Sequence, residues 1–166
     1  MSAYGKEGEV NGVSVAFGKV ENGVAETGCT TTRCFTGDAD GNVIPAIKIT
    51  FEKNPDAEDV AHEGSHAADR MDLKPALFLG SDQDYLNSPL NITKYATERR
   101  AYAVSSYVAQ AMGRSERNAN GTEFWNKGWS AAERETKRRI GVDAAVKSSN
   151  NVTPEKPGAR LLEFKK

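Results

Sequence analysis

The segment NPDAEDVAHEGSHAADRMD, residues 54–72, carries the clearest helix signal in the chain. Asn54 is suited to cap the start of a helix, Pro55 fits its first position, and acidic residues follow near the positive end of the helix dipole. Apolar and small residues then recur along one side of the helix: Val60, Ala61, Gly64, Ala67, Ala68 and Met71. We therefore predict a largely buried helix that packs with this side against the rest of the fold.

The two histidines of the chain, His62 and His66, both lie on this predicted helix. Residues four apart project from one face of a helix, so both imidazoles can bind one zinc ion about 2 Å away. Glu63 lies about 100° around the helix axis from His62, beside the position that a catalytic zinc ion leaves open. We expect zinc as the cofactor and Glu63 as the catalytic general base, because a carboxylate next to zinc-activated water can take its proton.

A catalytic zinc ion usually takes three protein ligands, so one more residue is needed. Asp72 lies six residues after His66, where the metzincin pattern HExxHxxGxxH, or its variant ending in Asp, places the last ligand. That pattern needs a glycine three residues after the second histidine, and Asp69 stands there. Asp72 is therefore kept as the less favoured candidate for the third ligand. If another residue is the ligand, Asp69 or Asp72 is expected to hydrogen-bond an imidazole.

Glu98 is the preferred third ligand. It lies on a second predicted helix, which begins near Asn91 or Thr93 and ends at Met112, before Gly113. An inward-facing stripe of this helix contains Tyr95, Glu98, Tyr102, Ser105 and Ala109. A carboxylate in such a stripe is costly to bury unless it is paired, and a zinc ion would pair it.

Tyr102 is the expected donor to the oxyanion of a tetrahedral intermediate, because both histidines are used as metal ligands. It lies one helical turn after Glu98. The alternative donors are Tyr95, Arg99 and Tyr107. The strand from Ala46 to Phe51, directly before the metal helix, is expected to present an edge to an extended peptide.

Residues 1–52 are predicted to form a β-rich part. Apolar residues alternate with polar ones in two runs: Val13, Val15 and Phe17, then Ile47, Ile49 and Phe51. Between these runs, GDADGN at residues 37–42 predicts a tight turn. A calcium loop is disfavoured, because Ile49 stands where the closing acidic residue would be.

Residues 54–146 are predicted to be mainly helical, and residues 147–166 to be a loose tail rich in Ser, Asn, Pro and Lys. An irregular connection is expected around residues 75–89. Ser130 and Glu133 fit a capping box, which predicts a third helix that ends near Ile140, before Gly141. Together the elements predict a single α+β domain over residues 1–166.

The charges of the chain nearly cancel, with 22 basic and 23 acidic residues interleaved along it. We therefore expect no nucleic-acid partner, and the basic run Lys137-Arg138-Arg139 is typical of a solvated helix face. No segment approaches the about 18 apolar residues of a membrane span, and the start of the chain has no secretion signal, so we expect a soluble chain. Cys29 and Cys34 could close a small disulfide in an oxidising compartment or remain two thiols.

The motif His62-Glu63-Gly64-Ser65-His66, followed by Glu98-Arg99-Arg100-Ala101-Tyr102, resembles gluzincin-type metallopeptidases. It is similar to the compact metallopeptidase domains at the C-termini of bacterial secreted effectors and polymorphic toxins, and the likeness covers about residues 54–112. The resemblance implies a zincin-like fold, zinc-dependent hydrolysis of a peptide or protein substrate, and a glutamate ligand on the second helix. It also implies secretion or delivery into a target cell as part of a larger protein, and a cognate immunity or inhibitor protein.

Two other functions fit the same residues. In the first, zinc only staples two helices of a non-catalytic interaction domain. In the second, the site hydrolyses another amide, such as a cell-wall peptide, because zinc and a carboxylate can direct water at any suitably placed carbonyl.

Overall fold

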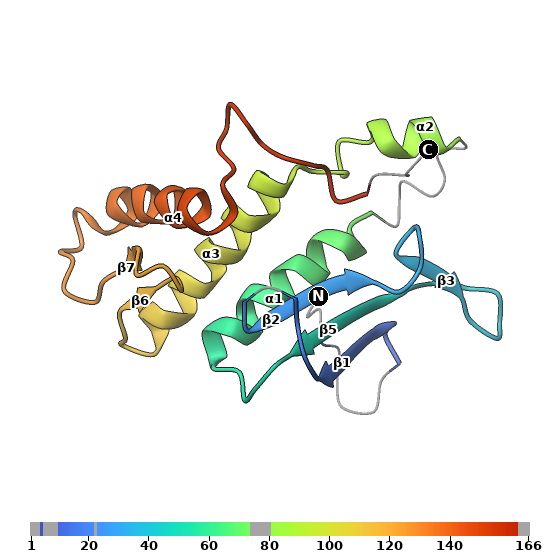
Figure 1. Ribbon diagram of the computed structural model, residues 1–166, viewed down its shortest axis with the longest axis horizontal. Coiled ribbons are helices and arrows are strands. Elements are labelled where there is room, and N and C mark those ends of the chain that lie inside the picture. The colour runs from blue at the N-terminus through green and yellow to red at the C-terminus, as the bar shows by residue number, and fades with distance from the viewer. Residues whose placement is uncertain (1–3, 5–9, 22, 74–80, 163–166) are drawn as a thin grey trace.

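The protein has a mixed α+β fold in the computed structural model, which describes Tyr4 and residues 10–21, 23–73 and 81–162. The strands in these ranges are β1 (Val13–Phe17), β2 (Ala25–Cys29), β3 (Phe35–Gly37), β4 (Val43–Pro45), β5 (Ile47–Phe51), β6 (Glu116–Arg117) and β7 (Glu123–Trp125). The helices are α1 (Ala57–Met71), α2 (Asp82–Asn87), α3 (Lys94–Ala111) and α4 (Arg134–Asn150). The predicted α+β class with a β-rich N-terminal part is confirmed (Figure 1).

A three-stranded sheet in the order β1-β5-β2 supports α1. β5 runs parallel to β1 and antiparallel to β2. The apolar residues Ile47, Ile49 and Phe51 of β5 are almost completely buried and form one core cluster with Ala67 of α1. The expected role of residues 46–51 as an edge strand is wrong, because β5 is paired on both sides. The edge strand on the opposite side of the sheet from β1 is β2.

Helix α1, which carries both histidines, begins later than predicted. Its N-cap is Asp56 and not Asn54, because Asp56 and Asp59 form a reciprocal capping box. The Asp56 carboxylate accepts from the main-chain N–H of Asp59 at 2.9 Å, and the Asp59 carboxylate lies 3.4 Å from the main-chain nitrogen of Asp56. The predicted apolar side is confirmed, since the residues packed against the sheet include Val60, Ala67, Ala68 and Met71.

The second predicted helix, α3, lies between α1 and α4 (Figure 1). Thr93 caps its start, and Met112 ends it before Gly113, as the sequence predicts. The hairpin of β6 and β7 packs against α4 and α3. The second core formed there contains Ala109, Phe124, Trp125, Val142 and Ala145.

The third predicted helix, α4, does not end at Ile140 but continues to Asn150. Gly141 is not a stop signal here, because it lies against the main chain of the β6–β7 hairpin. A Cβ atom at Gly141 would be 2.8 Å from the Cα of Phe124. The glycine therefore permits close packing of α4 on β7.

Arg138 was predicted on a solvated helix face, and this prediction is wrong. Its side chain is buried between the rings of Tyr107 and Trp125, with the guanidinium carbon 3.7 and 4.3 Å from the ring centroids. Cation–π contacts therefore draw this charge into the interior.

The regions between and after the helices are more ordered than predicted. The connection at residues 75–89 contains the short helix α2, while residues 74–80 lie outside the described residues. After α4, the main-chain N–H of Leu161 donates to the Ile92 carbonyl at 3.0 Å, and that of Lys94 donates to the Ala159 carbonyl at 2.6 Å. Residues 151–162 are thus fixed against the start of α3, and residues 163–166 lie outside the described range.

The predicted turn at residues 37–42 is confirmed, since it joins β3 and β4. The side-chain and main-chain donors of Asn42 hold the pKa of Asp38 below its usual range. A disulfide between Cys29 and Cys34 ties the end of β2 to the start of β3. Among the helices of the described residues, none is long and apolar enough to cross a membrane.

Candidate metal centre

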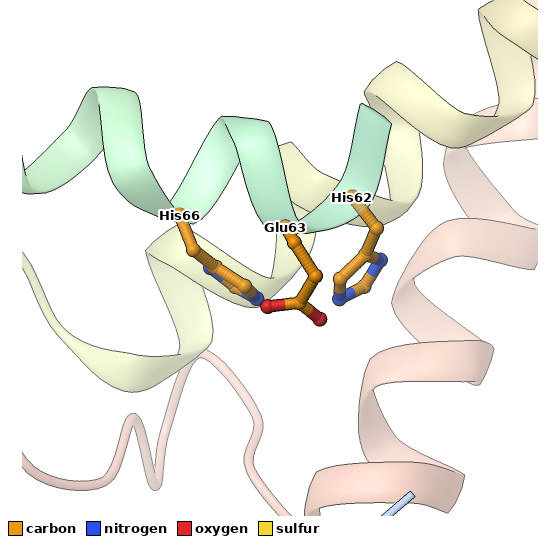
Figure 2. A group of neighbouring side chains, drawn as sticks. All are labelled: His62, Glu63 and His66. Atoms are coloured by element: carbon orange, nitrogen blue, oxygen red, sulfur yellow. The ribbon is translucent and has the colours of Figure 1, made fainter. Parts of the chain in front are cut away.

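His62 and His66 project from the same side of α1, as their spacing predicts (Figure 2). Ligand atoms of His62, Glu63 and His66 all lie within 4.8 Å of one another, and this group could hold a metal ion. The two imidazole rings meet edge to face, with centroids 4.9 Å apart. Within the described part of the chain, no second group of three such residues occurs.

Glu98 reaches the two histidines from α3. Its Oε2 atom lies 3.6 Å from the Nε2 atom of His62 and 3.6 Å from the Nε2 atom of His66. Two ligands of one tetrahedral zinc ion, each about 2 Å from it, are about 3.3 Å apart, so this spacing fits a shared ion. Burial alone would raise the pKa of Glu98, but the two imidazoles outweigh burial and hold that pKa well below its usual range.

The carboxylate of Glu63 is held from the side of the sheet. The hydroxyl of Thr27, on β2, donates to Glu63 Oε2 at 2.6 Å and lies 3.2 Å from the main-chain oxygen of Glu63. Both side chains are buried. The two glutamates therefore differ in their surroundings: Glu98 faces both Nε2 atoms, whereas one oxygen of Glu63 is already engaged by a hydroxyl.

The partner of the His66 imidazole is a threonine and not an aspartate. Nδ1 of His66 lies 2.9 Å from Oγ1 of Thr97, and both residues are buried. Asp69 pairs instead with Arg100 of α3 at 2.5 Å. Asp72 is exposed at the end of α1, about 240° around the axis from His66. The expectation that Asp69 or Asp72 orients an imidazole is therefore wrong, and Asp72 does not lie with the histidines as the alternative ligand would.

Tyr102 lies beside His62, with the two rings edge to face and their centroids 4.8 Å apart. Burial raises the pKa of Tyr102, a hydrogen bond with Ser149 lowers it less, and the charges of Glu98 and Glu63 raise it further. The phenol therefore stays protonated at neutral pH and can donate a hydrogen bond.

The alternative donors have other partners. Tyr95 and Arg99 both bind Asp143, at 3.1 and 2.7 Å, and Tyr107 binds Glu135 at 3.0 Å. Of the four candidates, Tyr102 is the one whose ring contacts a histidine of the group.

The histidines line a cleft of about 720 Å³. The stretch from Gly23 to Thr27 forms one wall, α3 contributes Glu98 and Tyr102, and α1 contributes Arg70 beyond His66. This volume is in the range of protein sites that take a small molecule or a few residues of a peptide.

Thr27 and Thr97 are the site residues that sequence reasoning missed. Thr27 reaches Glu63 only because the sheet places β2 beside α1, a contact across 36 residues that no local pattern reveals. Thr97 could have been predicted from its position in the sequence. It directly precedes Glu98, so a helix that turns Glu98 inward also brings this short polar side chain close to α1.

Comparison with known proteins adds no relative. No protein family, curated protein or solved structure matches the chain. Function therefore has to be inferred from the chemistry of the centre and its cleft.

Proposed function

We propose that the protein hydrolyses peptide bonds with a zinc ion held by His62, His66 and Glu98. The observation that carries this proposal is the position of Glu98, whose Oε2 atom is 3.6 Å from both Nε2 atoms. Two imidazoles and one carboxylate are a donor set that catalytic zinc sites use, and imidazole nitrogen suits zinc better than it suits calcium or magnesium.

The surroundings of Glu63 favour a catalytic site over a structural one. Structural zinc sites are closed by four protein ligands, whereas catalytic sites keep one position open. Glu63 is the fourth candidate, but one of its two carboxylate oxygens is engaged by Thr27. A metal bound by the other three residues would keep one position open toward the cleft, where substrate can enter.

Each residue of the proposed centre has a separate role in hydrolysis. A bound zinc ion would polarise the substrate carbonyl and lower the pKa of water beside it. Glu63 takes the proton of the attacking water and passes it to the leaving nitrogen, while Thr27 fixes the orientation of the carboxylate. Tyr102, which burial keeps protonated, donates to the developing oxyanion.

The edge of β2 supports a peptide as the substrate class. An edge strand offers unpaired main-chain N–H and C=O groups, to which an extended peptide can add as a further strand. β2 also borders the cleft at Thr27, beside Glu63. A peptide added antiparallel to β2, the commoner and slightly more stable pairing, would pass the level of Thr27 and so run beside Glu63.

We extend the proposal to a secreted or delivered effector on two grounds. The first is the resemblance of the HExxH and E-x-x-A-Y motifs to effector and toxin metallopeptidases, which also implies a cognate inhibitor. The second is the Cys29–Cys34 disulfide, since disulfides persist in oxidising compartments.

The test is hydrolysis of unfolded casein by the purified, zinc-loaded chain beside Glu63→Gln. We expect zinc-dependent cleavage by the wild type, and in Glu63→Gln a loss of roughly 100-fold or more with zinc still bound. Glu155→Gln, an exposed glutamate far along the chain, is the matched control and should keep full activity. Wild-type activity in Glu63→Gln would refute the mechanism.

The same assay separates the two alternative functions. A non-catalytic zinc staple would cleave no substrate, would tolerate Glu63→Gln and would unfold in His62→Ala. A cell-wall amidase would release peptides from purified cell wall and leave casein intact.

A further inference from the structure

The two ends of the cleft differ in charge. α1 and α3 run antiparallel, because His66 contacts Thr97 while the main-chain oxygen of Glu58 accepts from Ser105. At the end where α1 finishes and α3 begins, which we call the Arg70 end, the basic residues lining the cleft are Arg70, Lys94 and Arg160. At the other end, which we call the Asp59 end, the acidic lining residues include Glu21, Asp59 and Glu116, and the basic lining residue Arg117 is paired with Glu123 at 3.2 Å.

Arg70 is a half-buried cation without a carboxylate partner. Its guanidinium donates to the main-chain oxygen of His66 at 3.1 Å, and its buried Nε–H has no acceptor. Among the described residues, no carboxylate oxygen lies within 4.0 Å of it. Burial lowers the pKa of Arg70, although arginine stays charged at neutral pH. Such a charge is costly unless an anion approaches it.

The neighbouring glutamates do not account for this charge once the centre is complete. The negative charges of Glu63 and Glu98 sum to two, which equals the charge of one divalent ion. Asp69 is already paired with Arg100. The remaining carboxylate with an influence on Arg70 is Glu26, which is exposed on β2 and screened by water. The charge of Arg70 is therefore left for a ligand in the cleft.

The geometry fixes which part of a peptide faces Arg70. In Figure 1, β2 and α1 run in the same direction, so Arg70 lies beyond Glu63 toward the Cys29 end of β2. A peptide antiparallel to β2 has its amino-terminal residues over this end. The Arg70 guanidinium contacts the main-chain oxygen of His66, which is one turn after Glu63, while the Arg70 backbone is two turns after Glu63. Along the axis of α1, the guanidinium is therefore about 5 to 10 Å from Glu63. This distance corresponds to about two to three residues of an extended peptide.

The Asp59 end of the cleft favours basic side chains of a peptide, in contrast to the Arg70 end. Burial raises the pKa of Asp59 and of Glu116, and other carboxylates nearby raise both further. Glu58 does not share this role, because Arg114 forms a bidentate pair with it. Neither Asp59 nor Glu116 forms an ion pair with a basic side chain of the described residues, so both carboxylates repel an acidic side chain and attract a basic one.

We propose that the cleft selects peptides by the order of their charges, with Arg70 binding an acidic side chain two to three residues before the cleaved bond. Basic side chains are preferred after the bond, toward Asp59 and Glu116. This inference rests on the proposed peptidase function and names its substrate class: extended peptides that are acidic on the amino-terminal side and basic on the carboxyl-terminal side.

The test uses two synthetic peptides of identical composition. One has Glu before and Lys after a central apolar pair, and the other has the reverse order. For each peptide, kcat/KM is measured with the zinc-loaded wild type, and Kd is measured by fluorescence anisotropy with the zinc-loaded Glu63→Gln protein. We expect the Glu-first peptide to be preferred by about tenfold or more in both measurements, because a hydrogen bond between two charged groups is stronger than one between neutral groups.

Arg70 variants locate the origin of the preference. Arg70→Gln should reduce the preference for the Glu-first peptide to the part that the Asp59 end contributes. Arg70→Lys should keep most of the preference, and Arg70→Glu should reverse it. Arg139→Gln, an exposed arginine of α4 outside the cleft, is the matched control. If Arg70 only supported the glutamates of the centre, Arg70→Gln would slow both peptides equally, and the proposal would be overturned.

The two readouts separate this proposal from the proposed function. Cleavage of both peptides without an order preference would overturn the charge selection and leave the peptidase function standing. A preference in Kd that depends on Arg70, without cleavage of either peptide, would support the charge selection and refute the peptidase function. Absence of binding by both peptides would overturn both.

Discussion

Replacing Thr97 with valine should weaken zinc binding without disturbing the ligands themselves. In the wild type, Nδ1 of His66 lies 2.9 Å from the Thr97 hydroxyl in a buried contact. Zinc at Nε2 requires the Nδ1–H tautomer, and the hydroxyl oxygen accepts that proton. Without the hydroxyl, the metal-free imidazole can place its proton on Nε2, toward Glu98. Binding zinc then leaves a buried Nδ1–H without an acceptor.

The expected loss is about 10- to 100-fold in zinc affinity, or roughly 1.4–2.7 kcal/mol, as for other residues that orient a ligating histidine. It is measured by competition with a chromogenic zinc chelator at fixed pH. Thr97→Ser retains the hydroxyl and should stay near the wild type, and Thr136→Val, at an exposed position of α4, should have no effect. Equal affinity of Thr97→Val and wild type, or an equal loss in Thr97→Ser, would refute the role of this hydroxyl.

Three further predictions follow from the contacts described above. Thr27→Val should lower kcat by about tenfold or more while the zinc Kd stays unchanged, because the variant loses a hydrogen bond to the Glu63 carboxylate. A changed zinc Kd with unchanged kcat would contradict this role of Thr27. Gly141→Ala should lower the free energy of unfolding by about 1–3 kcal/mol in urea titrations, because the new Cβ atom would lie 2.8 Å from the Cα of Phe124. A stabilised variant would contradict the close packing of α4 on β7. In zinc-free protein, Glu98→Gln should be less stable than wild type at pH 6. The difference should shrink progressively as the pH falls below 4.5, the ordinary pKa of a glutamate, because the folded pKa of Glu98 lies well below that value. A pH-independent difference would contradict the ion pairing.

Local signals were sufficient to predict α1 and α3, the two helices that face each other at the candidate centre. The spacing of His62 and His66 places both side chains on one face of α1, and the inward stripe of α3 places Glu98 opposite them. Both results depend on helical periodicity, which is a property of residues a few positions apart. The ends of α3 also followed from local chemistry at Thr93 and Gly113.

The features that escaped prediction depend on contacts between distant segments. The position of β5 in the middle of the sheet is set by pairing with two other strands, so its own alternation did not reveal whether it would form an edge. Gly141 has the form of a stop signal, but packing on Phe124 makes it an interior residue of α4. Arg138 stands in a charged run, yet two aromatic rings bring it into the core.

The most direct test of the proposed centre is a crystal structure of the zinc-soaked protein with anomalous scattering at the zinc edge. Zinc should lie about 2 to 2.2 Å from the Nε2 atoms of His62 and His66 and from a carboxylate oxygen of Glu98, with Glu63 still bound to Thr27 and one position open to the cleft. Zinc bound by Glu63 in place of Glu98, or closed by four protein ligands, would contradict the hydrolytic centre proposed for this protein.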